Sequence, residues 1–101
     1  MAATLLDQSA IDAALAGLDS GCSGSPEKLS RSIDSADFQT AVEFVVRIAP
    51  RCEDMNHHPD LGVHWRRVDI ELSSHDAGGV TAKDTDLAAV IDQVAAGLPL
   101  A

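Results

Sequence analysis

Apolar and polar residues alternate most regularly along residues 66–74. Every second position of this stretch is apolar, namely Val68, Ile70 and Leu72. Because successive side chains of a strand point to opposite faces, the pattern predicts a strand with one buried and one polar side. Residues 28–33 alternate more briefly and predict a second strand, with one side formed by Leu29, Arg31 and Ile33. One-sided strands of this kind are typical of an antiparallel sheet covered by helices on one face.

A first helix is predicted over residues 7–18. Its apolar residues fall on one helical face and are Ile11, Leu15 and Leu18. Asp7 or Ser9 is the expected N-cap, and Gly17 marks the end. Residues 19–27 are rich in Gly, Ser and Pro, which predicts a loop or a weak edge strand.

A second helix is expected to begin after Ser35, which offers an N-cap. Its apolar residues spread over one face, as in an amphipathic helix: Phe38, Val42, Val45, Val46 and Ala49. Pro50 has no N–H to bond to the Val46 carbonyl and crowds that turn, so we predict a kink or break there. The polar residues 51–56 are expected to resume as a further turn of helix.

A last helix is predicted after the turn at Gly78-Gly79. Thr81 and Asp84 have the spacing of an N-cap and the third residue of a capping box. The buried stripe of this helix is expected to be Leu87, Ile91, Val94 and Leu98.

The predicted elements are few enough for one domain covering residues 1–101. Their order is helix, weak strand, strand, helix, extended segment, strand and helix. Strands interleaved with helices, without enough parallel crossovers for a doubly wound sheet, indicate an α+β two-layer sandwich. A domain this small buries a modest fraction of its surface, which favours self-association.

The charge of the chain argues against two classes of partner. Its 16 acidic and 7 basic residues give a net charge of −9, which repels nucleic-acid phosphates and anionic membranes. No apolar run approaches the ~20 residues of a membrane-spanning helix, and the first residues lack the basic start of a signal peptide. Two cysteines, Cys22 and Cys52, make no disulfide framework, so we expect a cytoplasmic protein.

The four histidines are the only concentrated chemistry in the chain, and all lie between residues 57 and 75. Pro59 favours extended backbone at His58, so the side chains of His57 and His58 should point to opposite faces. One imidazole can then donate a proton while the other accepts or orients, since an ordinary imidazole titrates near pH ~6.5. Taken locally, a solvated or carbonyl-capping pair is the favoured alternative. His75 belongs to the polar side or the exit of its strand.

Asp84 has both a structural and a functional interpretation. As the third helical residue, its carboxylate accepts N–H bonds of the first turn and interacts favourably with the helix dipole. It can also orient a histidine and fix its tautomer. Taken alone, the structural role is favoured.

Metal and thiol chemistry fit the sequence less well. Zinc sites use spaced Cys/His pairs or two ligands four residues apart on a helix, whereas here the histidines are adjacent and then widely separated. We therefore expect no metal, which argues against a metal-dependent hydrolase. Neither cysteine has basic or helix-N-terminal surroundings that would activate a thiol.

Together these residues resemble the pterin-4a-carbinolamine dehydratase family. The family pattern runs acidic-x3-His-His-Pro-x5-aromatic-x9-His-x8-Asp, and the chain supplies it with Glu53, His57, His58, Pro59, Trp65, His75 and Asp84. The resemblance extends from about Leu29 to the C-terminus and, more loosely, over the first helix.

The resemblance implies a four-stranded antiparallel sheet with three helices on one face, associated as a homodimer or homotetramer. It implies a cofactor-free loss of water from 4a-hydroxytetrahydrobiopterin, giving the quinonoid dihydropterin and supporting tetrahydrobiopterin recycling. His57 and His75 would transfer protons, His58 would bind and orient the pterin, and Asp84 would support them. Further contacts to the substrate are expected from Pro59, Trp65, Ser74 and Asp76.

Two features depart from the family pattern, and one alternative function remains. Cys22 stands where the family usually has Trp in its first strand, and a kink at Pro50 would shift His57 relative to His75 and lower activity. The alternative is a non-catalytic interaction or assembly protein on the same fold, because family relatives also act as dimerisation cofactors of transcription factors or in Rubisco assembly.

Overall fold

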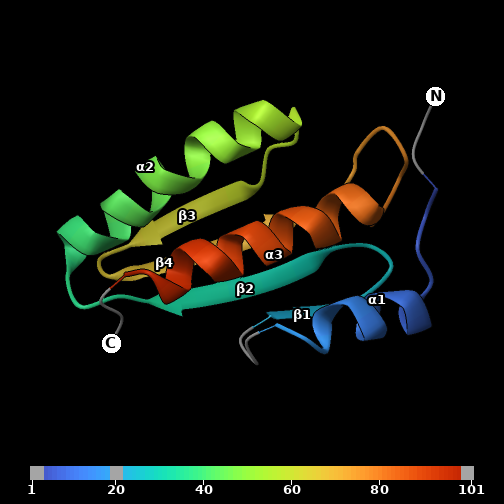
Figure 1. Cartoon of the computed structure of the whole chain (residues 1–101), viewed down its shortest axis with the longest axis horizontal. Helices are drawn as coiled ribbons and strands as arrows, with labels where there is room; N and C mark the ends of the chain where they lie inside the picture. Colours follow the sequence, from blue (N-terminus) through green and yellow to red (C-terminus); the bar gives the residue numbers. More distant parts are fainter. Residues whose placement is uncertain (1–3, 19–21, 99–101) are drawn as a thin grey trace.

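The computed structural model describes residues 4–18 and 22–98 and contains three helices and a four-stranded sheet (Figure 1). The elements are α1 (Gln8–Leu15), β1 (Cys22–Gly24), β2 (Leu29–Asp34), α2 (Phe38–Met55), β3 (Asp60–His64), β4 (Arg67–Leu72) and α3 (Ala82–Ala96). The strand order is β1-β2-β4-β3, and every neighbouring pair is antiparallel. The predicted α+β two-layer architecture is confirmed, and the Gly/Ser-rich segment does contribute an edge strand.

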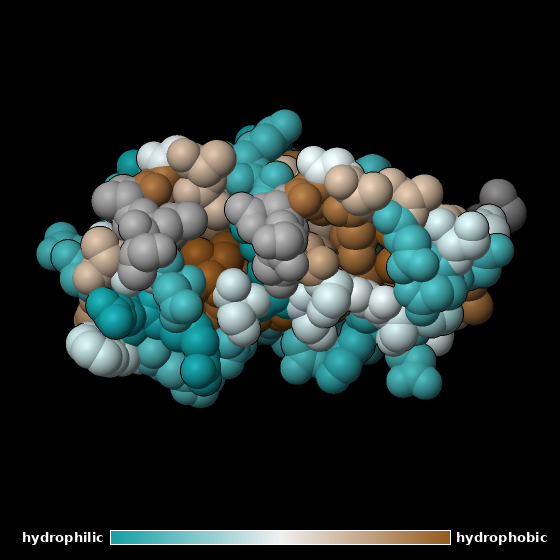
Figure 2. Space-filling model, turned by 90° about the horizontal axis from the view of Figure 1, so that it is seen from below, coloured by the Kyte–Doolittle hydropathy of each residue, from teal (hydrophilic) through white to brown (hydrophobic). Residues whose placement is uncertain are grey.

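The sheet has one apolar and one polar face, as the alternation predicts. In the register of β2 with β4, Leu29 lies opposite Leu72 and Ile33 opposite Val68, and all four are buried against the helices. The core also contains residues from each helix, including Ile11, Phe44, Ile48, Leu87 and Ile91. All three helices therefore cover the same face. The uncovered face is polar, and in Figure 2 hydrophilic residues (teal) follow the lower margin while hydrophobic residues (brown) gather above it.

Helix α2 runs through Pro50 without a break and ends at Met55, so the predicted break is wrong. A proline inside a helix costs about 3 kcal/mol because one hydrogen bond is lost and one turn is crowded. Here the ring itself is exposed, while Ile48 and Cys52 on either side of it are buried in the core. Burial of this face holds both halves of α2 in one helix.

The buried face of α2 also differs from the prediction. The structure buries the stripe Ala41, Phe44, Ile48 and Cys52. Of the predicted set, Phe38, Val42 and Val46 are 55%, 40% and 62% exposed, while Val45 is half-buried and Ala49 is exposed. Two neighbouring stripes of α2 are apolar, and periodicity alone does not say which of them meets the sheet.

The helix starts follow cap chemistry, with one correction. The Asp7 carboxylate accepts the Ala10 N–H and starts α1, as expected. The N-cap of α2 is Asp37, whose carboxylate accepts the Thr40 N–H at 2.7 Å, and not Ser35. Ser35 is buried, and its hydroxyl lies within hydrogen-bonding distance of two backbone carbonyls. The hydrogen bond from Thr40 also holds the pKa of the Asp37 carboxyl below its usual value.

Helices α1 and α3 are each slightly shorter than their predicted apolar stripes. Leu18 follows the end of α1 and is half-buried. Leu87, Ile91 and Leu98 are buried as predicted, whereas Val94 is only partly buried and Leu98 lies beyond the end of α3. Within the described ranges, no helix is long and apolar enough to span a membrane.

Candidate active site

The C-terminal end of α2 directs the side chain of His57 toward the protein interior. Asn56 adopts a left-handed conformation with φ 48°, which asparagine tolerates better than most residues. The Asn56 N–H bonds to the Glu53 carbonyl, and the His57 N–H bonds to the Cys52 carbonyl, both at 3.1 Å. This pair of hydrogen bonds is a Schellman motif, which ends a helix and reverses the chain direction. It leaves His57 only 9% exposed.

The N-terminal turn of α3 fixes Asp84 at the other side of this site. Thr81 and Asp84 form the predicted capping box, in which the Thr81 N–H bonds to Asp84 Oδ2 at 2.9 Å. The Ser74 hydroxyl donates to the same oxygen at 2.8 Å. Asp84 is fully buried. Its carboxylate is therefore held rigidly by donors from two segments.

His57 and Asp84 form a buried pair. His57 Nε2 lies 2.5 Å from Asp84 Oδ1, the carboxylate oxygen that the capping box does not use. One oxygen of Asp84 thus serves the helix start and the other serves the imidazole. The structural interpretation of Asp84 is confirmed, and the same side chain also contacts a histidine, so its functional role stays a prediction.

His58 points away from this pair, as the extended geometry before Pro59 predicts. Its side chain is 55% exposed, and its Nε2 lies 3.3 Å from Oε2 of Glu53. His58 and Pro59 line one side of a hollow of about 160 Å³ that lies against the C-terminal half of α2. Its other lining residues are largely apolar: Val45, Ile48, Ala49, Cys52, Glu53 and Leu61.

His75 and Asp76 lie in an exposed turn before α3. The turn is closed by pairing of Ser74 with Gly79, and Gly78 adopts φ 82°, which favours glycine there. His75 directly follows Ser74, which bonds to Asp84, so the turn begins at the His57–Asp84 pair. Among the described residues, no hydrogen bond joins the side chains of His75 and His57.

Trp65 is not brought near the histidine pair. It lies in the turn after β3, whereas the His57-His58-Pro59 segment lies before β3. The four steps from Asp60 to His64 span about 13 Å. Trp65 is 71% exposed with φ 56°, and the Arg66 guanidinium lies 4.9 Å from the centre of its ring. The contact of Trp65 with a substrate therefore stays a prediction.

Ser74 has a different place from the one expected for a substrate contact. It is 2% exposed, and its hydroxyl is used by Asp84 and by Thr81 Oγ1, which lies 2.7 Å away. Sequence reasoning assigned Thr81 only a cap and missed this hydroxyl pair. The available signal was that three polar residues, Ser74, Thr81 and Asp84, all flank one tight turn.

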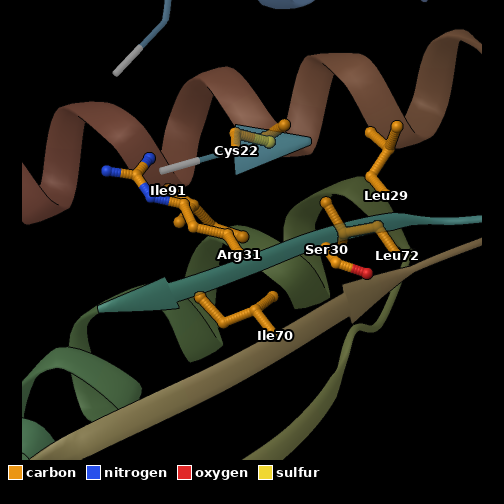
Figure 3. Close-up of a pocket in the computed structure, with 8 residues that line it drawn as sticks. Cys22, Leu29, Ser30, Arg31, Ile70, Leu72 and Ile91 are labelled. Atoms are coloured by element: carbon orange, nitrogen blue, oxygen red, sulfur yellow. The ribbon is translucent and has the colours of Figure 1, made fainter. Parts of the chain in front are cut away.

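The cavity in Figure 3 is separate from the histidines. It lies between the β1–β2 side of the sheet and α3, and has a volume of about 10 Å³, room for roughly one water molecule. Arg31 lies beside it, buried and bonded through Nη1 to Asp92 Oδ1 at 2.8 Å. A pterin cannot enter a space of this size. Nor do three potential metal-ligating side chains gather anywhere in residues 4–18 and 22–98.

The two thiols are expected to react slowly. Burial raises the pKa of Cys52, and burial likewise raises the pKa of half-buried Cys22, although the Arg31 charge acts in the opposite direction there. Since the thiolate is the reactive form, alkylation at neutral pH should be slower than for a free cysteine and should accelerate only above the ordinary thiol pKa of ~8.5. Mass spectrometry after timed iodoacetamide treatment measures this, with the urea-unfolded chain as control. Faster alkylation than free cysteine would contradict it.

The fold and the site together define a class of protein: a small α+β domain with a buried His–Asp pair between two helix termini. The family model for pterin 4 alpha carbinolamine dehydratase matches residues 4–94. The chain belongs to this family.

Individual relatives agree with the family match. The chain is 40% identical over 92 residues to a candidate pterin-4-alpha-carbinolamine dehydratase of Roseiflexus castenholzii, covering 91% of this chain and 98% of the relative. A relative of the same description from Sulfolobus acidocaldarius is 42% identical over 89 residues, covering 88% and 97% of the two chains. A crystal structure of a transcriptional coactivator/pterin dehydratase from Brucella melitensis matches with a TM-score of 0.85 and 33% identity, covering 91% of this chain and 99% of that one.

Proposed function

We propose that this protein removes water from a 4a-hydroxytetrahydropterin such as 4a-hydroxytetrahydrobiopterin. The observation that carries the proposal is the buried pair of His57 with Asp84 at 2.5 Å. A carboxylate that binds one nitrogen of an imidazole fixes its tautomer and leaves the other nitrogen for proton transfer. Family membership supplies the substrate class.

The reaction needs one acid and one base and no change of oxidation state. The C4a–O bond breaks, and the hydroxyl leaves as water after it receives a proton. The N5–H proton passes to a base, and a C4a=N5 double bond forms. His57 and His75 are the proposed proton-transferring pair, with exposed His58 orienting the pterin.

Dehydration of synthetic 4a-hydroxytetrahydropterin, followed by absorbance, tests this function. The intact protein should exceed the uncatalysed rate, and His75→Ala should be slower without a loss of stability because His75 is exposed. His64→Ala, an exposed histidine at the far end of β3, is the matched control. An intact protein that only matches the uncatalysed rate would leave the non-catalytic interaction role as the surviving alternative.

The chain is also proposed to associate with copies of itself. Six of its exposed large apolar side chains come from α2, β3 and the following turn: Phe38, Val42, Val46, Leu61, Val63 and Trp65. Strand β3 is an edge strand whose residues are mostly exposed, and such edges and patches mark interaction surfaces. This surface supports the expected homodimer or homotetramer.

Val46→Asp is expected to lower the assembly state of the protein. A charge at a side chain that is 62% exposed should be tolerated by the isolated chain but not in an apolar interface. Light scattering coupled to size exclusion measures the mass, and circular dichroism checks the fold. Ala13→Asp, at an exposed position of α1, is the control. A monomeric intact protein at micromolar concentration would rule out the proposed association.

A further inference from the structure

Behind the His57–Asp84 pair lies a pair of buried hydroxyl groups that the proposed reaction does not itself require. Ser74 and Thr81 are 2% and 0% exposed, and their oxygens are 2.7 Å apart. Substrate cannot reach either hydroxyl. Their contacts lead instead to the carboxylate that holds His57.

The direction of these hydrogen bonds follows from counting protons. A hydroxyl has one proton to donate. The Ser74 hydroxyl donates its proton to Asp84 Oδ2, so its oxygen must accept the proton of the Thr81 hydroxyl. The Thr81 oxygen in turn accepts the Lys83 N–H at 3.3 Å. The chain of donors therefore runs from α3 through Thr81 and Ser74 to Asp84.

Every partner of Asp84 except His57 is thus a fixed donor. Oδ2 receives the Ser74 hydroxyl and the Thr81 N–H, and a carboxylate only accepts hydrogen bonds. At Oδ1, His57 must then be the donor through Nε2–H.

The other nitrogen of His57 is the one that is open to a ligand. Within the described part of the chain, Arg31 Nε is the only fully buried side-chain nitrogen or oxygen without a hydrogen-bond partner. Nδ1 of His57 makes none of the described hydrogen bonds, so it must reach the surface. The side chain is 10% exposed, which agrees with one accessible edge of the ring.

We propose that Ser74 and Thr81 are positioning residues, whose hydroxyls hold Asp84 as the acceptor of His57 Nε2–H and so make Nδ1 the nitrogen that exchanges a proton with the substrate. This assignment rests on the proposed dehydratase function only for the identity of the substrate. The tautomer that it specifies is a property of the free protein.

The tautomer is measured without substrate. Long-range ¹H–¹⁵N spectra at about pH 8, where an ordinary imidazole is neutral, should show His57 protonated at Nε2 alone. In Ser74→Ala, the carboxylate loses one donor and is freer to turn, so His57 should populate both tautomers. Thr81→Ser keeps the hydroxyl and should keep the single tautomer, whereas Thr81→Val should not. A His57 that is protonated at Nδ1 in the intact protein would overturn the proposal.

Kinetics separate positioning from stability. Ser74→Ala should lower kcat by about tenfold to a hundredfold, with little change in KM. This is the range found when residues that orient metal-binding histidines are replaced. Asp37→Ala removes the N-cap of α2 and provides a loss of stability without a change at His57. If Ser74→Ala keeps both kcat and the single tautomer, the hydroxyl pair is only structural. If the intact protein lacks dehydratase activity but shows the Nε2–H tautomer, the proposed function fails while the hydrogen-bond assignment stands.

Discussion

Replacing His57 by alanine is expected to lower kcat/KM for pterin dehydration by about 10²- to 10⁴-fold, the usual contribution of a general acid or base. His57 is the only histidine that the described structure pairs with a buried carboxylate, and its free ring nitrogen reaches the surface. The neighbouring hydroxyls of Ser74 and Thr81 cannot take its place, because both are enclosed behind Asp84.

His57→Ala is also expected to destabilise the fold, since it leaves Asp84 Oδ1 buried without a donor. An unsatisfied buried group of this kind costs about 1–3 kcal/mol. His57→Gln separates the two effects, because its amide can donate to Asp84 but cannot act as a base. Urea unfolding should show a smaller loss of unfolding free energy for His57→Gln than for His57→Ala, while both variants show the large loss of kcat/KM. Activity in either variant close to that of the intact protein would remove His57 from the mechanism.

Asp84→Asn is expected to lower kcat by about 10²- to 10⁴-fold while the fold persists. The Ser74 hydroxyl and the Thr81 N–H need an acceptor, so the amide oxygen of the substituted side chain should take the place of Oδ2. The amide NH₂ then faces His57 Nε2 and forces that nitrogen to accept. The proton moves to Nδ1, and His57 can no longer take a proton there. The corresponding change in the serine-protease triad costs about 10⁴-fold in kcat for the same reason.

Two measurements check the Asp84→Asn prediction. Long-range ¹H–¹⁵N spectra should show the His57 proton at Nδ1, and steady-state kinetics should show the loss mainly in kcat. Asp86→Asn, an exposed position on the same helix, is the matched control. An Asp84→Asn protein with unaltered turnover would show that the tautomer of His57 does not limit the reaction.

Part of the site could be predicted because its determinants are local. The opposite orientation of His57 and His58 follows from the proline after them, and the capping box follows from the spacing of Thr81 and Asp84. For Asp84, orientation of a histidine could be predicted only as one of two interpretations, without saying which histidine. The His57–Asp84 pair joins residues 27 positions apart, and a sequence does not show which segments of the chain meet.

The errors have physical causes of the same kind. At Pro50, burial of Ile48 and Cys52 outweighs a local preference against helix. In α2, the choice between two apolar stripes is made by the shape of the sheet surface. Ser74 looked like a polar residue available to a ligand, and only the fold shows that a buried carboxylate faces it. For Trp65, which β3 separates from His57 and His58 along the chain, a contact with substrate stays a prediction.

The two carboxylate oxygens of Asp84 have different partners, and this would link ligand binding at His57 to the folding of α3. The carboxylate that starts α3 is the same one that holds His57, so opening of the first turn of α3 would release the imidazole. A ligand that binds only the assembled pair must therefore stabilise that turn, and the stabilisation grows as the ligand concentration rises above its Kd. Binding of a ligand at the exposed edge of His57 would in this way stabilise the N-terminus of α3.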